Sequence, residues 1–335
     1  MGLAVLAGLV YALVHQLRKT GFRWQVLVST VASLQWQWLA AAVLFALASY
    51  YGRALRWRVL LEPLHPNPSV WGLFSATIIG FTAITLLGRA GEFVRPYLIA
   101  ARNQVPFSSQ IAAWVLERIY DLLIALLIFG FGLSQVRASG ASVGPALAWT
   151  LQVGGWVVGV TCILCLALLL AIRHYSDRLR KRIMDALGFL SEHHLGRAER
   201  MLQALVQGVE STRSDRAILL LVGYTLLEWV IIAGCYFCIA KAFGDAVHFR
   251  FVDVVIFMGF TSFGAVVQIP GIGGGVQVVS VLVLTQLFEV PIETATAMAA
   301  LIWIITFVVI VPFGIGLSFY EGVSWRKIRK LEREI

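Results

Sequence analysis

The hydrophobic positions of this chain form long runs that are separated by short charged stretches. A helix needs roughly 20 apolar residues to cross the hydrocarbon core of a bilayer, and runs of about that length recur along the chain. They predict six crossing helices, over Leu3–Leu17, Trp36–Arg56, Ser108–Leu133, Ala146–Ile172, Ala217–Ala240 and Ala295–Phe319. The pattern therefore predicts an all-α polytopic membrane protein.

Two further apolar segments are interrupted by glycine-rich turns. The first, Ser69–Leu87, breaks at Gly88-Arg89-Ala90-Gly91-Glu92, and the second, Phe251–Ile269, breaks at Pro270-Gly271-Ile272-Gly273-Gly274-Gly275. Both contain the tripeptide Gly-Phe-Thr, at 80–82 and at 259–261. Irregular backbone at membrane depth persists only where it is buried in protein or lines a cavity. Paired broken segments of this kind point to a transport site.

We interpret each broken segment as a re-entrant helical hairpin, over Ser69–Arg102 and Phe251–Glu289. Three predicted crossings separate the two hairpins, so they should enter the membrane from opposite faces, the first from the cytoplasm and the second from outside. Their tips would then meet near the midplane, in the inverted-repeat arrangement of transporters. The alternative is that each segment forms two short tilted helices whose glycines allow close packing.

Composition supports the membrane class. The chain is 59% hydrophobic and 13% charged, with a mean hydropathy of +0.82. Its net charge of +9 lies mostly in the loops, which favours contact with anionic lipid and not with nucleic acid. The cysteines form two CxxC pairs inside apolar runs, and we expect them to be small buried hydrophobes. We expect no metal and no cofactor.

We expect one transmembrane domain over 1–335 with a charged excursion at 173–215, whose apolar positions fall at helical spacing. The excursion is either a surface for lipid or a partner, or a solvated hairpin. Loop charge places it and the C-terminal tail in the cytoplasm, and we expect the membrane to be a bacterial inner membrane. Arg18, Lys19 and Arg23 fall on the outer side, contrary to the rule.

Ionisable residues at membrane depth cost at least ~2.5 kcal/mol each, so they pair with one another or line a pathway. We expect such residues at the first turn, where Glu92 and Arg95 are three positions apart, and in the next span, where Glu117 and Asp121 share a face. The candidate substrate-binding residues are Arg89, Glu92, Arg95, Glu117, Arg118, Asp121 and the isolated mid-span Glu228. The candidate backbone positions at the two turns are Gly88, Gly91, Pro270, Gly271, Gly273, Gly274 and Gly275.

Two interpretations of these charges remain open. In the first, Arg89 and Arg95 bind an anionic group, while the carboxylates hold the arginines or exchange protons. In the second, pairs such as Glu92–Arg118 or Arg95–Asp121 only fasten the first hairpin to the next span.

Three motifs occur in order: Gly88–Arg95, Glu117–Asp121 and Ile269–Gly274. Together they resemble a flippase-like transmembrane family that is related to the membrane region of lysylphosphatidylglycerol synthase. The resemblance implies a polytopic helical fold and movement of lipids between leaflets. Its signature matches Gly91, Glu92, Arg95, Glu117, Arg118, Asp121, Pro270 and Gly273.

Two differences from this family affect the expected activity. The soluble aminoacyl-transferring domain of the synthases has no counterpart in this sequence, so we expect no lipid aminoacylation. Gln277 stands where relatives often have a glutamate, so proton coupling at that position is in doubt.

We therefore expect a flippase without its own ATPase, acting on an anionic or zwitterionic phospholipid or a lipid-linked molecule. The expected partners are membrane lipids, with a homo-oligomer or a lipid-synthesis enzyme left open. One alternative is a membrane-embedded head-group transferase with Glu92 or Asp121 as general base. The other is a non-catalytic membrane partner protein.

Overall fold

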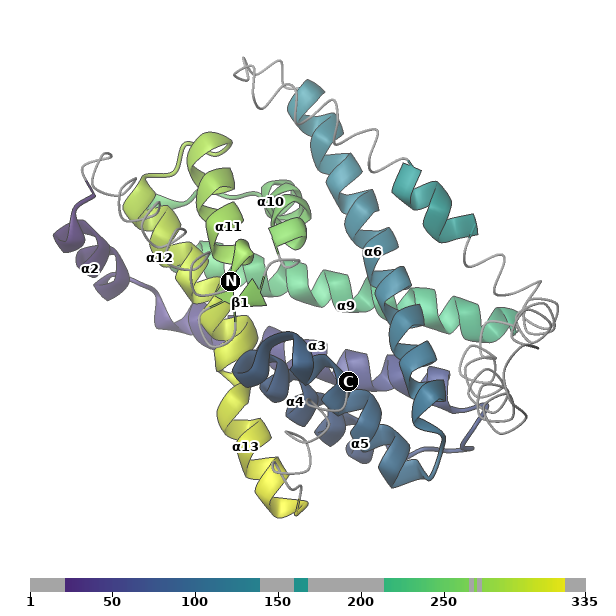
Figure 1. Ribbon diagram of the computed structural model, residues 1–335. Helices are drawn as coiled ribbons and strands as arrows, with labels where there is room; N and C mark the ends of the chain where they lie inside the picture. Colours follow the sequence, from purple (N-terminus) through teal and green to yellow (C-terminus); the bar gives the residue numbers. More distant parts are fainter. Residues whose placement is uncertain (1–21, 139–159, 168–213, 265–267, 270–272, 323–335) are drawn as a thin grey trace, which may run out of the picture.

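The computed structural model describes residues 22–138, 160–167, 214–264, 268–269 and 273–322 (Figure 1). Almost all of the regular structure in these ranges is helical. The elements are α2 (Trp24–Ala32), α3 (Trp36–Leu61), α4 (Val70–Leu87), the 3-10 helix η1 (Gly88–Phe93), α5 (Val94–Asn103), α6 (Phe107–Ala138), α9 (Asp215–Ala242), the 3-10 helix η3 (Gly244–Ala246), α10 (Phe251–Gly264), β1 (Gln268–Ile269), β2 (Gly273–Gly274), α11 (Gly275–Gln286), α12 (Ile292–Trp303), the π-helical turn η4 (Ile304–Val308) and α13 (Ile310–Tyr320).

Four helical segments of the described residues are long and apolar enough to cross a membrane: α3, α4, α9 and the continuous stretch Ile292–Tyr320. Three of them confirm predicted crossings, and α6 covers a fourth predicted crossing with 32 residues. The fourth candidate span, α4, is the segment that we interpreted as a hairpin arm. The chain is thus an all-α integral membrane protein, while the total of six crossings and the re-entry of the two hairpins stay predictions.

Several predicted segments lie outside the described residues. These are the first crossing at 3–17, most of the crossing at 146–172, nearly all of the excursion at 173–215 and the basic C-terminal tail. The location of that tail and the choice of the inner membrane also stay predictions.

The antiparallel helices α3 and α9 lie side by side at the centre of the molecule (Figure 1). The backbone N–H of Gln35, just before α3, donates to the carbonyl of Ala242 at the end of α9 over 2.9 Å. The remaining helices divide into two groups along this pair. We name α4, η1, α5 and residues 107–121 of α6 the charged half, and the rest of α6 with α10, β1, β2, α11 and α12, on which it packs, the apolar half.

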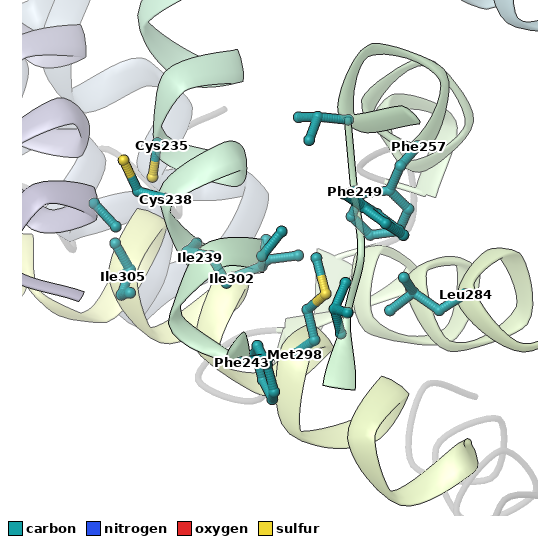
Figure 2. Packing of buried hydrophobic residues seen from close by; sticks show 14 of the residues in the cluster. Cys235, Cys238, Ile239, Phe243, Phe249, Phe257, Leu284, Met298, Ile302 and Ile305 are labelled. Atoms are coloured by element: carbon teal, nitrogen blue, oxygen red, sulfur yellow. The ribbon is translucent and has the colours of Figure 1, made fainter. Parts of the chain in front are cut away.

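The apolar half is held by a large cluster of buried hydrophobic side chains. Figure 2 shows part of it, where Phe249 and Phe257 lie near Leu284 and Met298. The cluster continues into the last turns of α9, where Cys235 and Cys238 are buried as free thiols. These two cysteines pack as small hydrophobes, as the sequence predicted.

The first interrupted segment folds as α4, η1 and α5, with η1 turned back against the end of α4. Gly88 ends α4 with φ of 68°, a conformation that glycine adopts without strain. A Cβ atom at Gly91 would collide with the backbone of Ala83 and Ile84. Gly88 is therefore favoured by its backbone conformation, and Gly91 is required by the close approach of two backbones.

The second interrupted segment folds as α10, a two-residue antiparallel ladder and α11. Gln268 pairs with Gly274 and Ile269 with Gly273 across the ladder. The N–H of Gly274 donates to Oε1 of Gln277 over 2.7 Å, which satisfies a free amide at the start of α11. β1 contacts η1, so the turns of the two interrupted segments lie next to each other.

The last long helical stretch is interrupted by the π-helical turn η4, where the N–H of Val309 bonds to the carbonyl of Ile304 over 2.9 Å. Pro312 follows and has no N–H to offer the carbonyl of Val308. Side chains of neighbouring helices donate hydrogen bonds to backbone carbonyls of this turn. Tyr50 Oη donates to the carbonyl of Thr306 over 2.5 Å. The irregular turn is thus fixed by side chains from α3 and α4, since Thr85 Oγ1 also donates to the carbonyl of Phe307.

Candidate functional site

A buried cluster of ion pairs surrounds Arg56, near the end of α3. The Arg56 side chain is 0% exposed. Its Nη2 atom lies 2.6 Å from Glu117 Oε1, and its Nη1 atom lies 2.5 Å from Asp121 Oδ1. Nη1 is also 3.4 Å from Glu228 Oε2. Arg56 therefore joins carboxylates that α6 and α9 bring together.

Two further arginines extend the cluster toward the first interrupted segment. Arg53, one turn before Arg56, lies 2.8 Å from Glu228 through its Nη2 atom. Arg95 enters from the start of α5 and forms an ion pair with Glu117. Glu117 thus holds arginines from two different helices.

Aromatic rings cover the inner faces of these guanidinium groups. The Arg95 guanidinium carbon lies 4.1 Å from the ring centroid of Trp57 and 5.4 Å from that of Phe81. Arg53 lies 4.7 Å from the same Phe81 ring. Trp57 is itself fixed, because its indole N–H donates to Gln110 over 3.0 Å. The rings stabilise the arginines by cation–π interaction where water is excluded.

Arg118 differs from the other arginines of the cluster because its side chain is 41% exposed. Its Nη2 atom lies 3.2 Å from Asp121 Oδ2 and 3.6 Å from Glu117 Oε2. Arg56, Arg95 and Arg53 are 0%, 4% and 14% exposed at their side chains. Of these four guanidinium groups, Arg118 is thus the most accessible from outside the protein.

The cluster lies at membrane depth. Glu228 is near the middle of α9, a helix of 28 residues. At a rise of about 1.5 Å per residue, this carboxylate is about 20 Å from either end of the helix. The hydrocarbon core of a bilayer is about 30 Å thick, so a bilayer centred on α9 encloses Glu228 and its partners. Mutual pairing is what allows so many charges to remain there.

Most of the charged residues predicted from the sequence meet in this cluster. Arg95, Glu117, Arg118, Asp121 and Glu228 all belong to it. Glu92 is half-buried on η1 and takes no part in the ion pairs of the described side chains. The backbone of Arg89 lies in η1, but its side chain is outside the described part of the structure.

The expected pairings within the cluster were wrong. Arg95 pairs with Glu117 and not with Asp121, and Arg118 pairs with Asp121 and not with Glu92. The expectation of an isolated Glu228 was also wrong, because Arg53 and Arg56 both reach it. These pairings depend on how α3 is rotated against α6 and α9, which spacing along the chain does not determine.

The second turn contributes backbone alone to the described structure. Gly273 and Gly274 form β2 and Gly275 begins α11, while Pro270 and Gly271 lie outside the described residues. The backbone N–H of Gly274, one of these candidate positions, already donates a hydrogen bond to Gln277.

Sequence reasoning missed the two arginines of α3. The predicted crossing Trp36–Arg56 put both arginines at its end, and neither was among the candidate site residues. The helix in fact continues to Leu61, and Val59, Leu60 and Leu61 of its last turn are buried. A signal was present, since three intramembrane carboxylates require cationic partners and these arginines are followed by apolar residues.

Fold and site together define a polytopic helical membrane protein with a buried charged cluster beside two interrupted helices. The family described as the lysylphosphatidylglycerol synthase TM region matches residues 1–314. The chain belongs to this family, as its motifs predicted.

One curated relative is the glycosyltransferase AglD of Haloferax volcanii, which is 31% identical over 124 residues. The match covers 37% of this chain and 20% of that protein, so the chain spans about a fifth of the length of this relative. No solved structure matches the chain.

Proposed function

We propose that this protein moves an anionic or zwitterionic lipid, or a lipid-linked molecule, between the leaflets of its membrane. The observation that carries the proposal is the mixed cluster of Arg53, Arg56, Arg95, Arg118 and their three carboxylate partners at membrane depth. Intramembrane charges of this kind commonly mark a substrate or ion pathway.

Stability alone is a weak reason to keep such a cluster. The desolvation of buried ion pairs offsets most of their Coulomb attraction, so apolar residues of similar volume are often as stable. The cluster also lies beside η1, where the two interrupted segments meet. Transporters place their substrate sites at such breaks near the midplane.

The exposure of each arginine suggests its role. Arg118 is accessible and would contact the polar head group. Arg56 and Arg95 are buried and engaged with carboxylates, so they would hold Glu117 and Asp121 in place. In this proposal the acyl chains stay in the bilayer while the head group passes the two turns, which re-enter from opposite faces.

The proposed activity is transport without an ATPase of this chain and without a change to the lipid. A second candidate is a role in transfer to a lipid head group, as an enzyme or as the membrane partner of one. The similarity to part of a glycosyltransferase favours this candidate. It predicts a lipid product of altered mass, which transport does not.

Leaflet exchange in proteoliposomes tests the proposal. Lipids that carry a dithionite-sensitive fluorophore on an acyl chain are reconstituted with the protein. Dithionite quenches the fluorophores in the outer leaflet, and the further loss of fluorescence reports exchange from the inner leaflet. We expect the wild type to exchange some lipids, and Arg118→Gln to reduce that exchange at least tenfold.

The matched control is Arg250→Gln in the apolar half. Arg250 pairs with Asp253 at 3.3 Å and at the same i, i+3 spacing as Arg118 with Asp121. This variant should exchange lipids like the wild type. If no lipid is exchanged by folded wild-type protein, or if both variants behave alike, the proposal is wrong.

A further inference from the structure

We infer that the site selects a head group with a single phosphodiester charge and no cationic amine. This inference rests on the proposed function and narrows its substrate class. It follows from the charge balance of the cluster, from the occupation of its carboxylates and from the free donors of one arginine.

Among the described side chains, the cluster has an excess of one positive charge. Four guanidinium groups, those of Arg53, Arg56, Arg95 and Arg118, face the carboxylates of Glu117, Asp121 and Glu228. An uncompensated charge in a medium of low dielectric constant is costly. One anion bound beside the cluster would neutralise it.

The carboxylate oxygens of the cluster either face arginines closely or are buried, so a head group reaches none of them without competing with a guanidinium group. Glu117 binds Arg56 through Oε1 and Arg95 through Oε2. Asp121 binds Arg56 through both oxygens, over 2.5 Å and 3.2 Å. Glu228 binds Arg53 through Oε1, while its Oε2 lies 3.4 Å from Arg56 Nη1, accepts no hydrogen bond from the described residues and is buried out of reach of a head group. The amine of a zwitterionic head group would therefore be unpaired here and close to arginines.

Arg118 has N–H donors that its ion pairs do not use. A guanidinium group has five N–H donors, and Arg118 makes ion pairs through Nη2 alone among the described residues. Its Nε atom is buried without a hydrogen-bond partner, while 41% of the side chain is exposed. The planar fork of arginine matches two oxygens of a phosphate group. The structure thus offers one accessible, under-used phosphate ligand.

The number of excess charges also discriminates between phosphates. A phosphodiester carries one negative charge and leaves the occupied cluster neutral. A phosphomonoester carries about −1.5 to −2 near pH 7, which would leave a net negative charge in the same place. The monoanion is therefore the better match.

The experiment compares four acyl-labelled probes in proteoliposomes of phosphatidylcholine: phosphatidylglycerol, phosphatidylcholine, phosphatidic acid and lysylphosphatidylglycerol. We expect phosphatidylglycerol to exchange at least tenfold faster than each of the other three. Arg118→Gln should bring its rate to within about twofold of phosphatidylcholine, and Arg118→Lys should keep part of the preference. Arg250→Gln should keep all of it.

The outcomes separate this inference from the proposed function. Equal exchange of phosphatidylglycerol and phosphatidylcholine by the wild type would overturn the selectivity and leave transport intact, as would a preference for phosphatidic acid or for the cationic lipid. No exchange of any probe would overturn both. Soluble glycerophosphoglycerol at millimolar concentration should not compete, and full inhibition by it would assign the site to a free phosphodiester and not to a lipid.

Discussion

The charged half and the apolar half use the same tripeptide in different surroundings. In the charged half, Gly80 makes room for α5, since a Cβ there would lie 2.5 Å from that of Arg95. In the apolar half, Gly259 makes room for α6, where a Cβ would lie 3.1 Å from Cα of Phe129. Both glycines thus serve close packing of helices.

The following phenylalanines show the difference. Phe81 covers Arg53 and Arg95, whereas Phe260 meets the edge of the Phe129 ring at a centroid distance of 4.9 Å. A repeated tripeptide therefore specifies how tightly two helices approach. The neighbouring helix decides whether the contact becomes an arginine site or an apolar core.

The largest test of this comparison removes the central arginine. Arg56→Met leaves buried carboxylates without their main partner, which costs about 3–5 kcal/mol. Arg250→Met removes an exposed ion pair of the apolar half and should not change stability measurably. Unfolding in mixed micelles by a denaturing detergent measures both. Equal stability of the two variants would show that the charges of the cluster do not depend on one another.

A smaller effect is expected from the glycines. Gly91→Ala forces a methyl group against the backbone of α4 and should cost about 3 kcal/mol through overpacking. Gly259→Ala meets looser contacts and should cost about 1 kcal/mol. The control is Gly223→Ala on α9, where nothing lies within 4 Å and helix propensity should raise stability slightly. The same unfolding assay would contradict the comparison if Gly91→Ala were the mildest of the three.

The coupling free energies of the two aromatic contacts should differ by less than the effects of the glycine substitutions. In a double-mutant cycle, Phe81 and Arg53 should couple by about 2 kcal/mol, because the cation–π contact is desolvated. Phe260 and Phe129 should couple by about 1 kcal/mol through their edge-to-face rings. Leucine replaces each phenylalanine and methionine replaces the arginine. A larger coupling in the apolar half would reverse the assignment of the stronger contact.

The smallest effect is expected at the edge of the charged half. Arg102 of α5 forms a half-exposed ion pair with Glu321 after α13, and Ser75 donates to the same carboxylate over 2.6 Å. Arg102→Gln should cost less than about 1 kcal/mol, because exposed pairs gain little from their Coulomb attraction. If Arg102→Gln lowered the free energy of unfolding as much as Arg56→Met, the stability of the charged half would depend on this exposed ion pair as much as on the buried cluster.

Much of the fold could be predicted because it depends on local pattern. Long apolar runs identified α3, α9 and the helices from Ile292, and the glycine turns identified both interrupted segments. The membership of Glu117, Asp121 and Glu228 in a polar site followed from the cost of charge in a membrane.

What could not be predicted is which partners those carboxylates have. α3 is apolar on most of its surface, so its sequence does not say which side faces α6 and α9. Arg53 and Arg56 are placed in the cluster by the packing of α3 along α9, a relation between residues about 170 positions apart, as in the contact of Arg56 with Thr225 (|i−j| = 169).

The π-helical turn η4 has a consequence for how this chain tolerates changes in length. The i→i+5 bond from Val309 to Ile304 closes a turn that holds one residue more than an α-helical turn. Loss of one residue from Ile304–Val308 would therefore leave an ordinary α-helical turn, and α13 would keep its register against α4, with Gly314 still fitting closely against Thr82. The same one-codon deletion within α12 would instead rotate the following helix by about 100°, so the chain tolerates a change of length at this turn and not beside it.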